Sequence, residues 1–197
     1  MEITRRVAVV APAAGFLLGF LDFLWIKFVP FPFGGLGNSI AVWAVAAFLL
    51  THLQRWSMTS AVSGAVVMLV VAVPSYYVAA ALIQNDDWST IWAFTSWLWM
   101  VLGGVAGVTF GVGGVVARRP GRLRVPALGL PAAVLLAEMI KALRAEAAGY
   151  AVVLPALAVL ITVLLGRSRR DRALALVCAV PLACLGYVLM IATVFGG

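Results

Sequence analysis

Charged residues are scarce in this sequence. Of its 197 residues only 11% are charged, 64% are hydrophobic, and the mean hydropathy is +1.11. A water-soluble protein of this length cannot bury so much apolar surface in one core. Apolar segments also recur up to the last residues, whereas a secreted protein would show one short apolar signal followed by a soluble body. We therefore expect an integral membrane protein with the lipid bilayer as its solvent.

Metal-binding and catalytic motifs are also lacking. The sequence holds one histidine, His52, and two cysteines, Cys178 and Cys184, whose spacing of six along one helix is too wide for a disulfide. Both cysteines are expected as small core residues. There is no serine, histidine and acid set for hydrolysis, no glycine-rich phosphate loop after a strand, and no acid-rich DDxxD run for magnesium-bound diphosphate. We expect neither a metal nor an organic cofactor.

Basic residues exceed acidic ones by 14 to 7, and their placement indicates topology rather than nucleic-acid binding. They gather in alternate connections between apolar runs: Arg5 and Arg6, Arg55, Arg118 to Arg124, and Arg167 to Arg172. Cytoplasmic loops carry such an excess, so the N-terminus is expected in the cytoplasm and the uncharged C-terminus outside. Twelve of the 14 basic residues are arginine, and alanine, glycine and valine are abundant, which favours a multi-pass protein of a bacterial inner (plasma) membrane.

Seven apolar runs are long enough to cross a bilayer as helices, two of them marginally. They lie at about 7–29, 38–54, 60–82, 91–117, 125–143, 150–166 and 173–195. We expect an all-α polytopic transmembrane bundle of seven helices, forming a single domain over residues 1–197. A six-helix arrangement is the alternative, because charges between Glu138 and Glu146 interrupt the fifth and sixth runs and could mark a re-entrant hairpin.

Polar and aromatic residues are expected to concentrate in the outer half of this bundle. In the predicted orientation Asp22 lies about 10 Å below the outer end of its helix, given a rise of about 1.5 Å per helical residue. Glu138 lies at a similar depth. We predict one cavity there with Asp22 and Glu138 as its acids. The candidate substrate-binding residues are Asn38, Trp43, Tyr76, Tyr77, Trp97, Trp99 and Tyr187.

An acid inside a spanning helix is costly and usually faces the bundle interior, so each one suggests a functional site. Asp22 shares a helix face with Gly15 and Gly19, and such small residues allow close helix packing. A structural hydrogen bond or ion pair remains the alternative for Asp22. For Glu138 the corresponding alternative is an ion pair with Lys141, three residues later on the same face.

A carboxyl in an apolar cavity resists ionisation and can therefore act as an acid near neutral pH. Aromatic faces stabilise cations, and a cavity within the bilayer excludes water that would quench a carbocation. These properties suit the proton-initiated cyclisation of an isoprenoid. The seven-span plan, the small size, Asp22 and Glu138 resemble the membrane-bound terpene cyclases of meroterpenoid and indole-terpenoid biosynthesis. The resemblance implies that one acid protonates a terminal alkene or epoxide, and that the other assists or removes the final proton.

A second resemblance rests on local sequence. Asn38-Ser39 with Trp43, Ser75-Tyr76-Tyr77, the stretch 107–114 and Ala137-Glu138 are similar to an uncharacterised family of bacterial integral membrane proteins. The chain departs from that pattern at Val108 and Thr109, where such a family often carries proline.

Transport is the main competing function. A small-molecule transporter or membrane substrate-binding subunit could use Asp22 or Glu138 to bind a proton or a cationic solute. The sequence shows no inverted repeat, and few polar residues line the inner half of the spans. A structural or regulatory membrane protein without a ligand is the third possibility.

Overall fold

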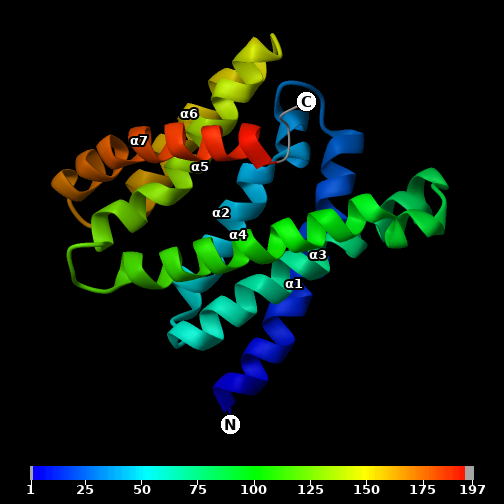
Figure 1. Cartoon of the computed structure of the whole chain (residues 1–197), viewed down its shortest axis with the longest axis horizontal. Coiled ribbons are helices and arrows are strands. Elements are labelled where there is room, and N and C mark those ends of the chain that lie inside the picture. The colour runs from blue at the N-terminus through cyan, green and yellow to red at the C-terminus, as the bar shows by residue number, and fades with distance from the viewer. Residues whose placement is uncertain (1, 194–197) are drawn as a thin grey trace.

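The computed structural model describes the backbone of residues 2–193, and among them the side chains of residues 6–37 and 39–188. Seven α-helices and two short 3-10 helices make up this part of the chain, which contains no strand (Figure 1). Their bounds are α1 Glu2–Phe28, η1 Phe33–Asn38, α2 Ile40–Gln54, α3 Met58–Gln84, η2 Trp88–Trp92, α4 Phe94–Arg118, α5 Arg124–Arg144, α6 Ala148–Leu165 and α7 Arg169–Thr193. The all-α architecture expected from the apolar runs is confirmed.

Six of the helices are long and apolar enough to cross a membrane, as in a multi-pass membrane protein. The exception is α2, whose 15 residues extend about 22 Å, less than the roughly 30 Å of a bilayer core. The 3-10 helix η1 precedes α2, and Ser39 lies between them in an extended conformation. The predicted span 38–54 therefore corresponds to α2, which begins at Ile40, and its start is buried, since Ser39 is 2% and Ala41 0% exposed.

The fifth and sixth predicted spans are complete helices and do not form a re-entrant hairpin. Helix α5 has 21 residues and α6 has 18. They are joined by a tight connection in which Glu146 adopts a left-handed backbone conformation, with φ of 57°. The charges near Glu138 therefore mark the end of α5 and a turn, and do not break the spans.

Polar contacts define two ends of the bundle. At one end Arg118 donates to the carbonyl of Trp56, and Arg124 forms an ion pair with Asp171 at 3.1 Å. At the other end Lys27 donates to the carbonyl of Ile83, which joins the last turns of α1 and α3. The connections that carry Arg55, Arg118 to Arg124 and Arg167 to Arg172 therefore share one end, which we call the arginine-rich end. Such clustering is typical of the cytoplasmic side.

Close backbone approaches at glycine hold two groups of helices together, α1 with α3 and α4, and α5 with α6 and α7. Gly15 and Gly19 of α1 lie against the carbonyls of Met68 and Ala72 in α3, where a side chain would clash. In the second group Gly129 of α5 packs against α7, and a Cβ there would lie 2.6 Å from the Ala175 carbonyl oxygen. Helix α2 lies between the groups and contacts α4 and α5 (Figure 1).

The outward faces of the helices are apolar, as a lipid-facing surface requires. Leu185 and Val188 of α7, for example, are exposed, whereas alanine dominates the buried positions. Cys184 lies on this exposed face of α7, so the expectation that both cysteines are core residues was wrong for Cys184. Apolar composition alone does not separate core from surface in a bilayer, because both are apolar.

We expect Gly19→Ala to lower the melting temperature of the purified protein in detergent. The new methyl group would meet the Ala72 carbonyl, which belongs to the α3 backbone and cannot yield easily. Gly104→Ala is the matched control, because nothing lies within 4 Å of the added Cβ. Replacing glycine by alanine in a helix is otherwise favourable by about 1 kcal/mol, so Gly104→Ala should leave the melting temperature unchanged or raise it. Equal effects of the two substitutions would contradict the α1–α3 packing.

The orientation is tested with a reporter that fluoresces only in the cytoplasm. Fused after Gly197 it should be dark, and inserted at the exposed Gly121, between α4 and α5, it should be bright. The physical reason is the concentration of arginine at the Gly121 end. A bright C-terminal fusion would contradict the predicted topology, in which the N-terminus is cytoplasmic and the C-terminus is outside.

Candidate functional site

Asp22 lies where two hollows of the bundle meet. It is in the last third of α1, its side chain is 8% exposed, and it lines both hollows. Trp43, in the first turns of α2, lines the smaller hollow together with Asp22. Close packing of Gly19 on α3 fixes the rotation of α1 that turns Asp22 toward α2. The Asp22 carboxyl is thus buried but open to both hollows.

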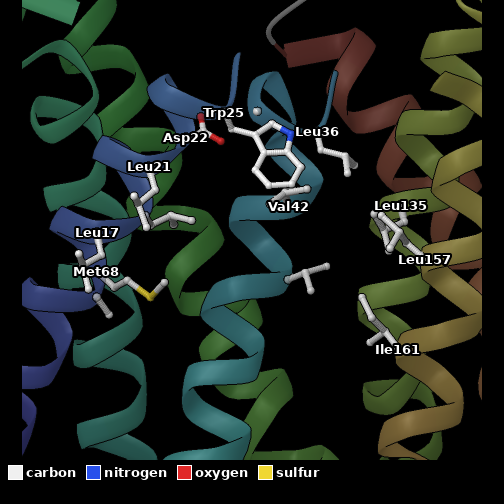
Figure 2. A pocket seen from close by; sticks show the side chains of 14 residues that line it. Leu17, Leu21, Asp22, Trp25, Leu36, Val42, Met68, Leu135, Leu157 and Ile161 are labelled. Carbon is white, nitrogen blue, oxygen red and sulfur yellow. The ribbon is translucent and has the colours of Figure 1, made fainter. Parts of the chain in front are cut away.

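The larger hollow is an elongated groove of about 530 Å³, which we call the apolar groove. Figure 2 shows Asp22 and Trp25 at one end of it, with aliphatic side chains along the rest. Leu17 and Leu21 of α1 form one wall, and Leu157 and Ile161 of α6 lie on the opposite wall. Its remaining lining residues are Ala14, Leu18, Leu36, Gly37, Val42, Val45, Met68 and Leu135. Asp22 supplies its one ionisable group.

The smaller hollow, of about 240 Å³, is rich in aromatic residues, and we call it the aromatic cleft. It lies between α1, α2, α3 and α4. Its aromatic and polar lining residues are Asp22, Ser39, Trp43, Tyr76, Tyr77 and Trp99. The Tyr76 ring is held edge-to-face between Phe23 and Tyr77, with ring centroids 5.4 Å away in each case. These contacts orient the rings of the cleft before any ligand binds.

Glu138, the second intramembrane acid, is engaged within the protein. Its Oε2 accepts a hydrogen bond of 2.9 Å from the backbone N–H of Ala41, and its Oε1 accepts one from the Tyr150 hydroxyl. Glu138 is 9% exposed, almost the same as Asp22, but it lines neither the apolar groove nor the aromatic cleft. The predicted single cavity with both acids is therefore not what the structure shows.

These contacts surround the beginning of α2. Ser39 is the N-cap residue of α2, and its Oγ accepts from the backbone N–H of Val42 at 3.1 Å. Tyr150 reaches the same region through its hydroxyl, which donates to Glu138. We call Ser39, the Ala41 N–H, Glu138 and Tyr150 the α2 cap. It satisfies amides that the first turn of a helix leaves unpaired, and it joins α2 to α5 and α6.

Besides Glu138, two of the predicted site residues, Trp97 and Tyr187, line neither hollow. Trp97 is 52% exposed and lies near Trp92, with ring centroids 6.5 Å apart and ring planes tilted by 39°. Trp97 and Trp99 are two residues apart, about 200° around the helix, so only one of them can face the cleft. The Tyr187 ring lies under the Arg144 guanidinium, 5.1 Å from its carbon. Asn38 lies in η1, outside the residues whose side chains are described.

These differences arise because the position of a residue in the sequence gives its depth in the membrane but not the rotation of its helix about the helix axis. Glu138 and Tyr187 are at a suitable depth but on other sides of the bundle. Sequence reasoning missed Tyr150, Ser39 and Trp25. Ser39 carries a recognisable signal, since serine before an apolar run is typical of an N-cap. Tyr150 and Trp25 had no such signal.

The other acids of the described chain do not add to the site. Asp87 lies in the connection between α3 and η2, is exposed, and accepts a hydrogen bond of 2.8 Å from the backbone N–H of Ser89. That bond stabilises the charged carboxylate, which lowers the pKa of Asp87. Within the residues that the structure describes, no group of three or more histidine, cysteine or acidic side chains could hold a metal ion.

Comparisons with known proteins place the chain among relatives without an assigned activity. Neither the curated proteins nor the solved structures gave a match. One family matches residues 1–194, almost the whole chain, and is described as a family of unknown function (DUF6518). The chain belongs to this family of unknown function.

Proposed function

We propose that the protein is a membrane-embedded terpene cyclase that binds an isoprenoid-like substrate in the apolar groove, with Asp22 as its proton donor. One observation carries the proposal: Asp22 is the carboxyl at the junction of the apolar groove and the aromatic cleft. The other intramembrane acid, Glu138, is bound by two protein donors.

The groove suits a ligand that arrives from the bilayer. Leu17 and Leu21 line it and are both 54% exposed, and Trp25 is 44% exposed, so the α1 wall continues into the lipid-facing surface. Water has no polar partners along the aliphatic walls, so the groove excludes it. An isoprenoid chain fits such walls, and its reactive end would lie against Asp22. Pockets of this size and lining are typical of small-molecule sites.

The reaction needs no co-reactant. The protonated Asp22 carboxyl donates its proton to the less substituted carbon of the terminal alkene, and the alkene electron pair forms the new C–H bond. The resulting tertiary carbocation is attacked by the electron pair of a second alkene in the same chain, which forms the ring C–C bond. A C–H bond beside the final cation then gives its proton to the Asp22 carboxylate and its electrons to a new C=C bond. The product is an isomer of the substrate, and Asp22 regains its proton.

Two features of the site support this chemistry. Burial of Asp22 beside Trp43 restricts the carboxyl, and a positioned proton donor reacts faster than a mobile one. Trp43, Tyr76, Tyr77 and Trp99 stand beside it in the aromatic cleft, where their ring faces would stabilise a developing carbocation by about 0.5 to 2 kcal/mol each.

Glu138 then has a positioning role rather than a catalytic one. It holds the start of α2 through Ala41, and α2 carries Trp43, which lines the aromatic cleft beside Asp22. Because the same carboxyl can give and take back the proton, one acid facing the substrate is sufficient. Trp97, Tyr187 and Asn38, which the sequence suggested as substrate contacts, are not needed in this proposal.

The aromatic cleft also favours a second candidate, the binding or transport of an organic cation. Four aromatic residues and one carboxylate surround a space of about 240 Å³, a composition that suits an ammonium ion. This candidate requires an ionised Asp22 and a small ligand in the cleft. The cyclase requires a protonated Asp22 and a long ligand in the groove.

The variant Asp22→Asn distinguishes the cyclase from the organic-cation candidate. The amide keeps the size of the side chain but cannot transfer a proton, so product formation should fall by about 10² to 10⁴. The assay is product analysis in membranes supplied with farnesylated or geranylgeranylated aromatic compounds. Asp86→Asn, the same change in the exposed loop after α3, is the matched control and should have no effect.

Unchanged product from Asp22→Asn would exclude the cyclase mechanism. The cation candidate predicts instead that the wild-type protein forms no cyclised product and that tetraethylammonium raises its melting temperature. That increase should be absent in Asp22→Asn, because the anionic partner has been removed.

A further inference from the structure

The arginine-rich end carries far more positive charge than the protein neutralises. The connections after α2, α4 and α6, with the last residue of α4, the first residue of α5 and the first turn of α7, contain nine arginines and a single acid, Asp171. The arginines are Arg55, Arg118, Arg119, Arg122, Arg124, Arg167, Arg169, Arg170 and Arg172. This excess is independent of Asp22 and of the proposed reaction.

Several of these arginines are built into the helix ends rather than lying free on loops. Arg124, the first residue of α5, has a side chain that is 17% exposed. Its terminal nitrogen pairs with Asp171, but its Nε is buried without a hydrogen-bond partner. Arg118 donates to the Trp56 carbonyl, and Arg172 donates through Nε to the Gly166 carbonyl at 3.1 Å. Carbonyls hold the side chains in place but do not cancel their charge.

The helices that carry these residues pack against each other. Ala117 of α4, Ala127 of α5 and Ala175 of α7 belong to one buried cluster with Phe48 of α2. One turn further along α2, His52 contacts the Gly114 carbonyl of α4 through its Nδ1, at 3.2 Å. The ends of α2 and α4 and the beginnings of α5 and α7 are therefore close together.

The beginning of α5 adds to this positive region. Its N-cap residue, Leu123, makes no side-chain hydrogen bond to the first turn. The Arg124 N–H already donates to the Gly121 carbonyl and Pro126 has no N–H, so the Val125 N–H is the amide of this first turn that is left for another acceptor. The helix dipole adds a partial positive charge at the same place. The buried, unpartnered Nε of Arg124 lies in this same first turn.

We propose that the junction between α4 and α5 binds a phosphate group, with Arg118 and Arg124 as its principal ligands. Arginine matches phosphate oxygens with two parallel donors, and uncapped helix starts bind the same anion. The phosphate could be the headgroup of an anionic phospholipid or a free phosphate. Basic pockets between spanning helices at the cytoplasmic side are typical lipid headgroup sites.

The test is the melting temperature of the detergent-purified full-length protein with three additions. These are dioleoylphosphatidylglycerol, dioleoylphosphatidylcholine, and inorganic phosphate compared with chloride at the same ionic strength. We expect phosphatidylglycerol to raise the melting temperature by about 5 to 10 °C when it is about 100-fold above its dissociation constant. A comparable increase with inorganic phosphate would identify free phosphate as sufficient. No increase with either phosphatidylglycerol or phosphate, or an equal one with phosphatidylcholine, would overturn the proposal.

Variants locate the site. Arg118→Gln with Arg124→Gln should abolish the increase, whereas Arg144→Gln, at the opposite end of α5, should retain it. Arg124→Lys keeps the charge next to Asp171 but removes Nε, so it tests the site even where the double variant fails to fold. We expect Arg124→Lys to lose at least half of the increase. A full increase in Arg124→Lys, or an equal loss in Arg144→Gln, would contradict this site.

Discussion

The hydrogen bonds from Ala41 and Tyr150 to Glu138 are the contacts on which the rest of the site depends. A carboxylate inside a membrane bundle is costly unless donors surround it, and here one donor is the start of a helix whose dipole also favours negative charge. The contacts tie α5 and α6 to α2, which makes few contacts of its own with α1. Helix α2 is thereby held between the two helix groups, where it separates the apolar groove from the aromatic cleft.

Two acids with nearly equal burial therefore differ in whether their carboxyl groups are available to a ligand. Glu138 has both oxygens occupied by protein donors, and moving it would leave the first turn of α2 without its cap. Asp22 lies beside Trp43 and faces two hollows. Burial alone does not identify a reactive carboxyl. What distinguishes Asp22 is that space for a ligand remains next to it.

The sequence predicts the helices well because a spanning segment must be apolar, about 20 residues long and internally hydrogen-bonded. It also predicts that Trp43, Tyr76, Tyr77 and Trp99 are near Asp22, because orientation converts position into depth. Rotation about each helix axis depends on packing partners distant in sequence, so Glu138, Trp97 and Tyr187 could not be placed correctly. Tyr150 could not be recognised either, because its contact with Glu138 exists only once α5 and α6 pack together.

The structural role of Glu138 is tested most directly by a double-mutant cycle with Glu138→Gln and Tyr150→Phe, measuring the free energy of unfolding in detergent. Each single change leaves a buried polar group unpaired and should cost about 1 to 3 kcal/mol. We predict that the double variant loses less than the sum of the two, with a coupling of at least about 1 kcal/mol, whereas Asp22→Asn combined with Tyr150→Phe is additive. Additive effects of Glu138→Gln and Tyr150→Phe would contradict the account, because Glu138 would then not hold α2 through Tyr150.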